Sequence, residues 1–131
     1  AANRAAQMKD FGTIRIKVSP RRAPITETNV PLLELLDVLR DAKSVPDAKV
    51  DTVVETIAER IDALSPADIK KLQKLAVDYY NAATRALLGA ILDRIGQPVL
   101  ASLRLSINPT TRFELGMDLA AWPQARAWNI R

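Results

Sequence analysis

Residues 65–96 read SPADIKKLQKLAVDYYNAATRALLGAILDRIG and carry the longest helical pattern of the chain. Ser65 can cap the first free amides of a helix, and Pro66 suits the first helical position because it has no N–H to satisfy. Gly96 can adopt the left-handed conformation that ends a helix. Between these signals apolar residues recur at steps of three and four, as on one helix face: Ile69, Leu72, Ala76, Tyr79, Ala83, Leu87, Ala90 and Ile91. The sequence therefore predicts a spine helix over residues 65–95, about 45 Å long.

Two further helices are predicted before the spine. Residues 31–43 are rich in leucine and begin with Pro31, a residue favoured at helix starts. Residues 47–64 begin at Asp47, a good capping residue, and carry a narrow apolar seam at helical spacing. Because the connections are short, we expect the three helices to pack as antiparallel neighbours in one layer.

A period of two marks three other segments as strands. Residues 13–18 alternate between apolar and polar side chains, and residues 99–107 do the same. Residues 112–115 follow the turn-like sequence NPTT and can return as a short strand. We therefore predict a small antiparallel sheet packed on the helical layer, which makes the fold class α+β. Such a sheet has open edges, which invite pairing with another chain.

Length and composition indicate one globular domain over residues 1–131, because 48% of the residues are hydrophobic. We interpret residues 1–10 as a flexible arm or an added segment, and residues 116–131 as a C-terminal tail. No apolar run approaches the roughly 18 residues of a membrane span, so we expect no membrane partner.

The composition argues against most enzymatic chemistry. The chain contains no cysteine and no histidine, which excludes thiolate or imidazole metal sites, thiol nucleophiles and the Ser-His-Asp triad. Its four glycines form no phosphate-binding loop. Carboxylates spaced four apart at Asp37/Asp41 and Asp51/Glu55/Glu59 lie opposite the apolar seams and indicate solvated faces. We therefore expect no catalytic residues, cofactor, metal or small-molecule substrate.

Charge is distributed unevenly along the chain. The net charge is +4 overall, but residues 1–30 carry +4 and residues 31–64 carry −4. Opposite charge on successive segments favours packing between copies or onto a charged partner.

Five residues are candidates for such an interface: Ile14, Ile16, Gly89, Trp122 and Trp128. The two isoleucines lie on the predicted edge strand. Gly89 interrupts the spine, and close approach of another helix, in cis or from a second copy, is a natural reason. The two tryptophans either cap the core or anchor the tail in a partner's pocket. An anchoring role predicts that Trp128→Ala weakens association by about 2 kcal/mol or more with the fold intact.

A second hypothesis is nucleic-acid binding. Its candidate phosphate contacts are Arg21, Arg22, Lys70, Lys71 and Lys74. Asp78 and Asp93 interrupt this basic line, and no aromatic residues alternate with it as single-strand binding would require. Protein binding is therefore favoured over nucleic-acid binding.

The segment LRLSINPTTRFELGMDLAAWPQARAWNIR, residues 103–131, lies behind a helical body and a basic N-terminal strand. In this arrangement the chain resembles small prophage-encoded proteins used in virion or tail assembly. The resemblance implies a non-enzymatic part, located in the cytoplasm or the virion, that self-associates or binds other assembly proteins. We therefore predict a structural, assembly or adaptor protein, with a nucleic-acid-binding accessory protein as the alternative.

Overall fold

A computed structural model describes residues 25–42 and 49–131. Its helices follow in the order η1 (Glu27–Asn29), α2 (Val30–Arg40), α3 (Val50–Asp62), α4 (Pro66–Tyr79), α5 (Ala82–Ile95), α6 (Ala101–Leu105) and η3 (Pro123–Trp128), where η denotes a 3-10 helix. The two helices predicted before the spine are thus present as α2 and α3. The proposed capping residue Asp47 lies outside the described residues, and Lys49 occupies the N-cap position of α3.

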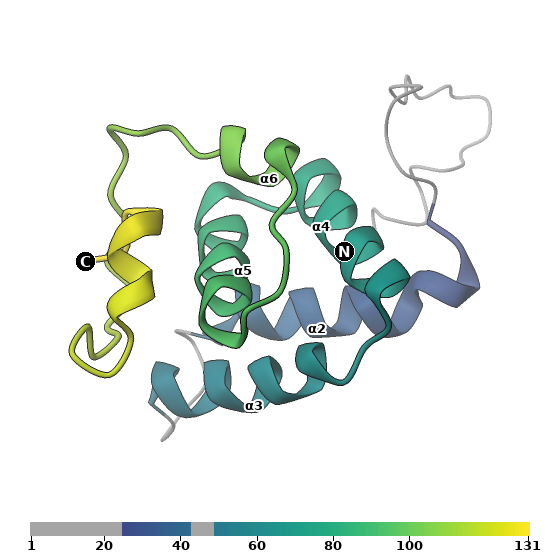
Figure 1. Ribbon diagram of the computed structural model, residues 1–131, viewed down its shortest axis with the longest axis horizontal. Coiled ribbons are helices and arrows are strands. Elements are labelled where there is room, and N and C mark those ends of the chain that lie inside the picture. Colours follow the sequence, from purple (N-terminus) through teal and green to yellow (C-terminus); the bar gives the residue numbers. More distant parts are fainter. Residues whose placement is uncertain (1–24, 43–48) are drawn as a thin grey trace.

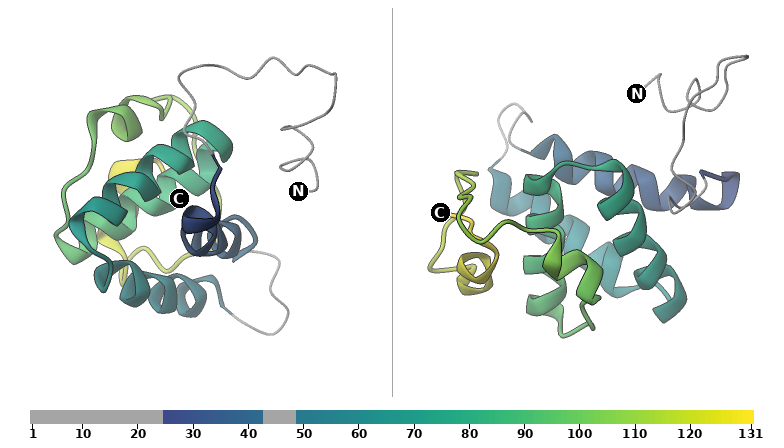
Figure 2. Two further views of the ribbon diagram at one scale, coloured as in Figure 1. Left: turned by 90° about the vertical axis from the view of Figure 1, so that its right-hand side faces the viewer. Right: turned by 90° about the horizontal axis from the view of Figure 1, so that it is seen from above.

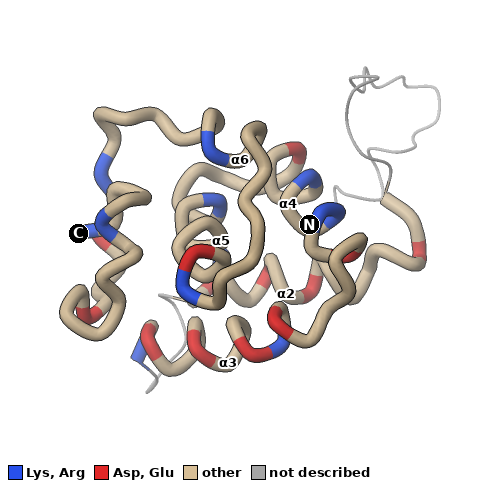
Figure 3. Tube along the Cα trace, viewed as in Figure 1, with Lys and Arg blue, Asp and Glu red and all other residues tan. Residues whose placement is uncertain are grey.

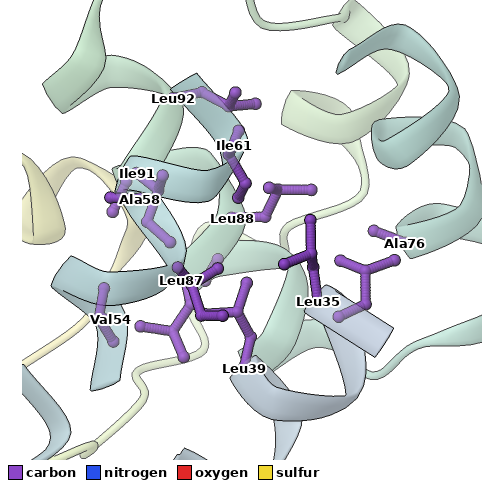
Figure 4. Packing of buried hydrophobic residues seen from close by; sticks show 14 of the residues in the cluster. Leu35, Leu39, Val54, Ala58, Ile61, Ala76, Leu87, Leu88, Ile91 and Leu92 are labelled. Atoms are coloured by element: carbon purple, nitrogen blue, oxygen red, sulfur yellow. The ribbon is translucent and has the colours of Figure 1, made fainter. Parts of the chain in front are cut away.

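Helix α5 lies at the centre of the described structure, where α2, α3, α4, α6 and η3 all contact it (Figures 1 and 2). Its sequence ALLGAIL, residues 86–92, is buried on every side, as expected of a helix without a polar face. The neighbouring helices contribute leucine, isoleucine and valine side chains, such as Leu35, Val54 and Ile61, to the same core (Figure 4).

The predicted spine is wrong as a single helix, because the chain breaks between α4 and α5 at Tyr80 and Asn81. Both ends of the predicted segment are nevertheless as expected: Ser65 Oγ accepts a hydrogen bond from the Asp68 amide at 3.1 Å, and Gly96 ends α5 with φ +75°. The two halves pack against each other instead of forming one long rod (Figure 1).

A second helix start at Asn81 explains the break. The Asn81 side-chain oxygen accepts hydrogen bonds from the Thr84 amide at 2.9 Å and the Thr84 hydroxyl at 2.7 Å. An asparagine that caps the next helix cannot also continue the previous one. Tyr80 takes an extended conformation at the break, and its buried hydroxyl donates to the Leu33 carbonyl at 3.1 Å or to the Asp37 carboxylate.

The predicted strand 99–107 is also wrong, because its centre forms the short helix α6. Leu103 and Ile107, four residues apart, are buried, whereas Leu105 is 82% exposed. The backbone before α6 bonds to a buried side chain and not to a neighbouring strand. Gln73 accepts a hydrogen bond from the Leu100 amide at 2.7 Å and donates one to the Pro98 carbonyl at 3.1 Å.

The α+β fold class is therefore contradicted, since residues 25–42 and 49–131 contain no sheet. Residues 112–115 form no hairpin with residues 99–107; instead Phe113 makes an isolated parallel bridge with Ile130. The predicted strand 13–18 lies outside the described residues. Across these residues the fold is helical, and no helix in them is both long enough and apolar enough to cross a membrane.

The last residues of the chain fold back on α5. We call residues 113–131 the C-terminal clasp. The clasp contains η3 and is held together by the Phe113–Ile130 bridge, in which the Phe113 amide donates to the Asn129 carbonyl at 2.8 Å and the Arg131 amide to the Phe113 carbonyl at 2.8 Å. Figure 1 shows the clasp in yellow and yellow-green beside α5.

Candidate interaction surfaces

The clasp places the Trp128 indole directly on α5 at Gly89. Trp128 is 1% exposed, and a Cβ atom added at Gly89 would lie 2.4–2.5 Å from three atoms of the indole ring. Such contacts are shorter than real Cβ atoms tolerate, so only glycine fits here while the indole is in place. The close approach predicted at Gly89 is present, and the neighbouring helix is η3 of the same chain.

Polar contacts hold the Trp128 ring at its edge and over its face. The indole Nε1–H donates a hydrogen bond of 2.7 Å to the Asp93 carboxylate on α5. The Arg104 guanidinium from α6 lies 4.3 Å from the ring centroid, within range of a cation–π interaction. Arg104 also donates to the Ala127 carbonyl at 2.9 Å, so α6 fastens the clasp from a second side.

Trp122 occupies a similar position at the other end of η3. It is fully buried, and the Arg94 guanidinium lies 3.9 Å from its ring centroid while donating to the Ala121 carbonyl. Its Nε1–H has no hydrogen-bond partner in the structure. Trp122 is therefore held by packing and by the cation above it.

Both tryptophans thus cap the core of their own chain. Of the two alternatives left open by the sequence, core capping is the one seen in this structure. Because the indole belongs to the core, we expect Trp128→Ala to destabilise the fold and not only to weaken association. Ile14 and Ile16 of the predicted edge strand lie outside the described residues.

Helix α3 carries four acidic residues along its length, at positions coloured red in Figure 3: Asp51, Glu55, Glu59 and Asp62. Steps of four, four and three place them on one face of a helix. Asp51 accepts two hydrogen bonds of 3.2 Å from the Asp118 amide, and Asp62 accepts one of 3.3 Å from Gln97. Glu55 and Glu59 are exposed, and no cation of the described residues pairs with either.

The first turns of α4 present three lysines. Lys70, Lys71 and Lys74 are all exposed, and none forms an ion pair with a carboxylate of residues 25–42 or 49–131. Arg21 and Arg22, the other proposed phosphate contacts, lie outside the described residues. The structure therefore places three of the five basic candidates on one helix and leaves their charges available.

A pocket of about 220 Å³ lies between α2, α3 and α5, with an apolar lining that includes Leu39, Leu87 and Leu115. Its charged lining residue is Arg40, which bonds Asp41 at 3.1 Å and lies 3.4 Å from Asp37. The hydrogen bond to Arg40 lowers the pKa of the Asp41 carboxyl below its ordinary value. Because Arg40 is already paired, it offers little attraction to an anionic ligand.

Clustered carboxylates can also bind a metal ion. No group of three or more aspartate or glutamate residues in the described chain could hold one. Three of the five acidic positions singled out in the sequence have structural partners: Asp37 and Asp41 bond Arg40, and Asp51 bonds the clasp backbone.

Three residues that fasten the clasp were missed as a group by sequence reasoning, namely Asp93, Arg94 and Arg104. In the sequence Asp93 stands out only as an interruption of a basic line, and Arg104 only as a position within the predicted strand 99–107. No local motif marks their role, because each acts on a tryptophan far away in the sequence.

The chain was compared with known proteins at the level of sequence and of structure. The comparison found no match to a protein-family model, a curated protein or a solved structure. Its function must therefore be argued from its own residues.

Proposed function

We propose that this protein is a non-enzymatic assembly or adaptor protein that binds copies of itself or another protein, the role implied by its resemblance to prophage assembly proteins. The observation that carries the proposal is the segregation of charge. Residues 1–24 carry a net charge of +5, and the rest of the chain carries −1. Within that remainder, α3 exposes Glu55 and Glu59 without partners among the described residues.

Charge of this kind suits reversible contact between proteins. Complementary patches raise the association rate and suppress wrong partners, while each exposed ion pair contributes only about 0.2–1 kcal/mol. Screening over roughly 8 Å at physiological salt makes such contacts sensitive to ionic strength. We therefore propose that the basic residues 1–24 of one copy meet the acidic face of α3 on another.

Neutralising this face is expected to weaken self-association. The double variant Glu55→Gln/Glu59→Gln removes two carboxylates without changing their size, and losing two exposed pairs should raise the dissociation constant roughly tenfold. Sedimentation equilibrium over a dilution series, at low and at high salt, measures this constant. The association of the wild type should itself weaken at high salt.

A matched control is available on the preceding helices. Glu27→Gln/Glu34→Gln removes the same charge from two exposed positions outside α3 and should leave the dissociation constant within about twofold of wild type. Equal effects of the two double variants would show that only net charge matters. A dissociation constant that changes with neither double variant nor with salt concentration would contradict the charge-based proposal.

A second candidate function, nucleic-acid binding, is favoured by the unpaired lysines of α4. If they contact phosphates, Lys70→Glu/Lys71→Glu/Lys74→Glu should abolish binding to a duplex. For the wild type, the logarithm of the binding constant should fall with the logarithm of the salt concentration, and these three contacts should contribute about −2.7 to that slope. Fluorescence anisotropy with a labelled duplex at several salt concentrations tests this.

The control for the lysine variant reverses three exposed cations elsewhere, Lys49→Glu/Arg112→Glu/Arg126→Glu. It makes the same change in net charge without touching α4. Loss of binding in the α4 variant alone would support a nucleic-acid interface on α4. Undetectable or salt-independent binding by the wild type would remove this candidate.

A further inference from the structure

The clasp is bonded within itself, so it can move as a unit. Its two ends are joined by the backbone hydrogen bonds between Phe113 and residues 129 and 131. The Ile130 amide donates to the Ala125 carbonyl at 3.1 Å, and the Trp122 amide to the Asp118 carbonyl at 2.9 Å. None of these bonds involves the helical body, and all would survive if the clasp left α5.

The connection between the body and the clasp is exposed and polar. Residues 108–112 are all exposed and run from the region after α6 to the clasp (Figure 1). They are tied to the clasp by a hydrogen bond of 3.0 Å from the Asn129 side chain to the Asn108 carbonyl. Extending this connection would therefore expose no apolar surface of its own.

The place where the clasp lies on α5 is specific. Trp128 packs where position 89 has no side chain, its Nε1–H is accepted by the Asp93 carboxylate, and its ring lies beside the Arg104 guanidinium. A second copy of the chain presents the same three features in the same arrangement. Exchange of clasps between two copies would keep every one of these contacts.

We propose that two copies of this chain associate by exchanging their C-terminal clasps, so that Trp128 of each copy packs on Gly89 of the other. The inference rests on the proposed self-association and adds a second mode of contact between copies, which is independent of the charge-based contact at α3. In the exchanged dimer both tryptophans remain buried as they are in the monomer. They would therefore contribute to assembly and to the core at the same time.

Concentration decides between the closed monomer and the exchanged dimer. A short flexible connection gives the clasp an effective concentration of about millimolar for its own α5. At micromolar protein the closed monomer should therefore prevail. Exchange becomes competitive when copies are crowded to near-millimolar local concentration, as in an assembling particle, or when the connection is too short to close.

The first test uses the complete wild-type chain, unfolded in guanidinium and refolded at micromolar and at near-millimolar concentration. Light scattering coupled to size exclusion should find a monomer after the first and an added dimer after the second. The dimer should persist on dilution, because separation requires a clasp to open, and high salt should not dissociate it. A chain that refolds only as monomer at both concentrations would overturn the proposal.

The second test shortens the connection. Deleting residues 109–111 removes about 10 Å of reach but none of the buried residues. The deletion variant should form dimers at micromolar concentration, with both tryptophans still buried by fluorescence. The control Pro109→Gly/Thr110→Gly/Thr111→Gly keeps the length and should remain monomeric. A monomeric deletion variant with buried tryptophans would contradict exchange.

The two proposals fail separately. A salt-sensitive oligomer that responds to Glu55→Gln/Glu59→Gln, found without any concentration-trapped dimer, would overturn clasp exchange and leave charge-based assembly standing. A trapped dimer that is unaffected by salt and by this double variant would support exchange and would argue against association through the acidic face of α3. A chain that stays monomeric in every condition would overturn both.

Discussion

Trp128→Ala is expected to lower the free energy of unfolding by about 4 kcal/mol, which is within the range found when a buried aromatic side chain is truncated to alanine. The indole is 1% exposed, so its removal leaves a cavity against α5. It also leaves the Asp93 carboxylate without its 2.7 Å donor and Arg104 without the ring beneath it. Since small domains are stable by about 5–15 kcal/mol, this one change removes a large share of the total.

Urea unfolding followed by circular dichroism measures this loss. Trp128→Phe keeps an aromatic ring but cannot donate to Asp93, so it should cost about half as much. Leu105→Ala is the control, because Leu105 is 82% exposed, and it should change stability by no more than about 0.5 kcal/mol. A Trp128→Ala variant as stable as this control would show that the clasp does not hold the fold.

Gly89→Ala is expected to lower the free energy of unfolding by about 2 kcal/mol, although alanine is the better helix former. In an open helix the substitution would gain up to about 1 kcal/mol. Here the new methyl group would lie 2.4–2.5 Å from the Trp128 ring, and overpacking of this kind costs about 1–3 kcal/mol or more. Steric conflict should therefore outweigh helix propensity.

Gly96 provides a matched comparison for Gly89. A Cβ atom at Gly96 meets nothing within 4 Å, but its φ of +75° is unfavourable for alanine. Gly96→Ala should therefore cost about 1–2 kcal/mol through the backbone alone, whatever residue stands at position 128. Thermal unfolding of both variants, in the wild type and in the Trp128→Ala background, separates a cost of contact from a cost of conformation.

The ends of the helices in the body could be predicted from the sequence where a capping or helix-ending residue lies at the helix end itself. Ser65, Pro66 and Gly96 fix helix ends through their own side chains or backbone, and the structure shows each in that role. Asn81 carries an equally local signal, with Thr84 three residues later. The apolar steps of three and four continue from Tyr79 to Ala83, and this continuity hid the break.

The sheet was predicted wrongly because residues 99–107 fit two patterns. Leu103 and Ile107 belong both to an alternating strand and to a helix face with a step of four. In the structure Gln73 on α4 forms hydrogen bonds with the backbone at residues 98 and 100, just before the helix begins, and this favours the helix over the strand. Contacts between residues so distant in sequence cannot be read from local periodicity.

Two residues of the contact between the clasp and α5 stand out in the sequence, but their pairing does not. Gly89 was singled out for close approach and Trp128 for burial, yet nothing in the sequence says that each is the other's partner. The lysines of α4, and Glu55 and Glu59 of α3, are exposed, as expected of residues opposite an apolar face. Asp51 of α3 is instead half-buried and bonds the clasp backbone.

A double-mutant cycle between Gly89→Ala and Trp128→Ala tests most directly whether the clasp closes on α5 at this contact. The four proteins are compared by urea unfolding. We predict that Gly89→Ala destabilises the wild type by about 2 kcal/mol but stabilises the Trp128→Ala variant by up to about 1 kcal/mol, because the methyl group then enters free space. The same cost in both backgrounds, within about 0.5 kcal/mol, would contradict the contact.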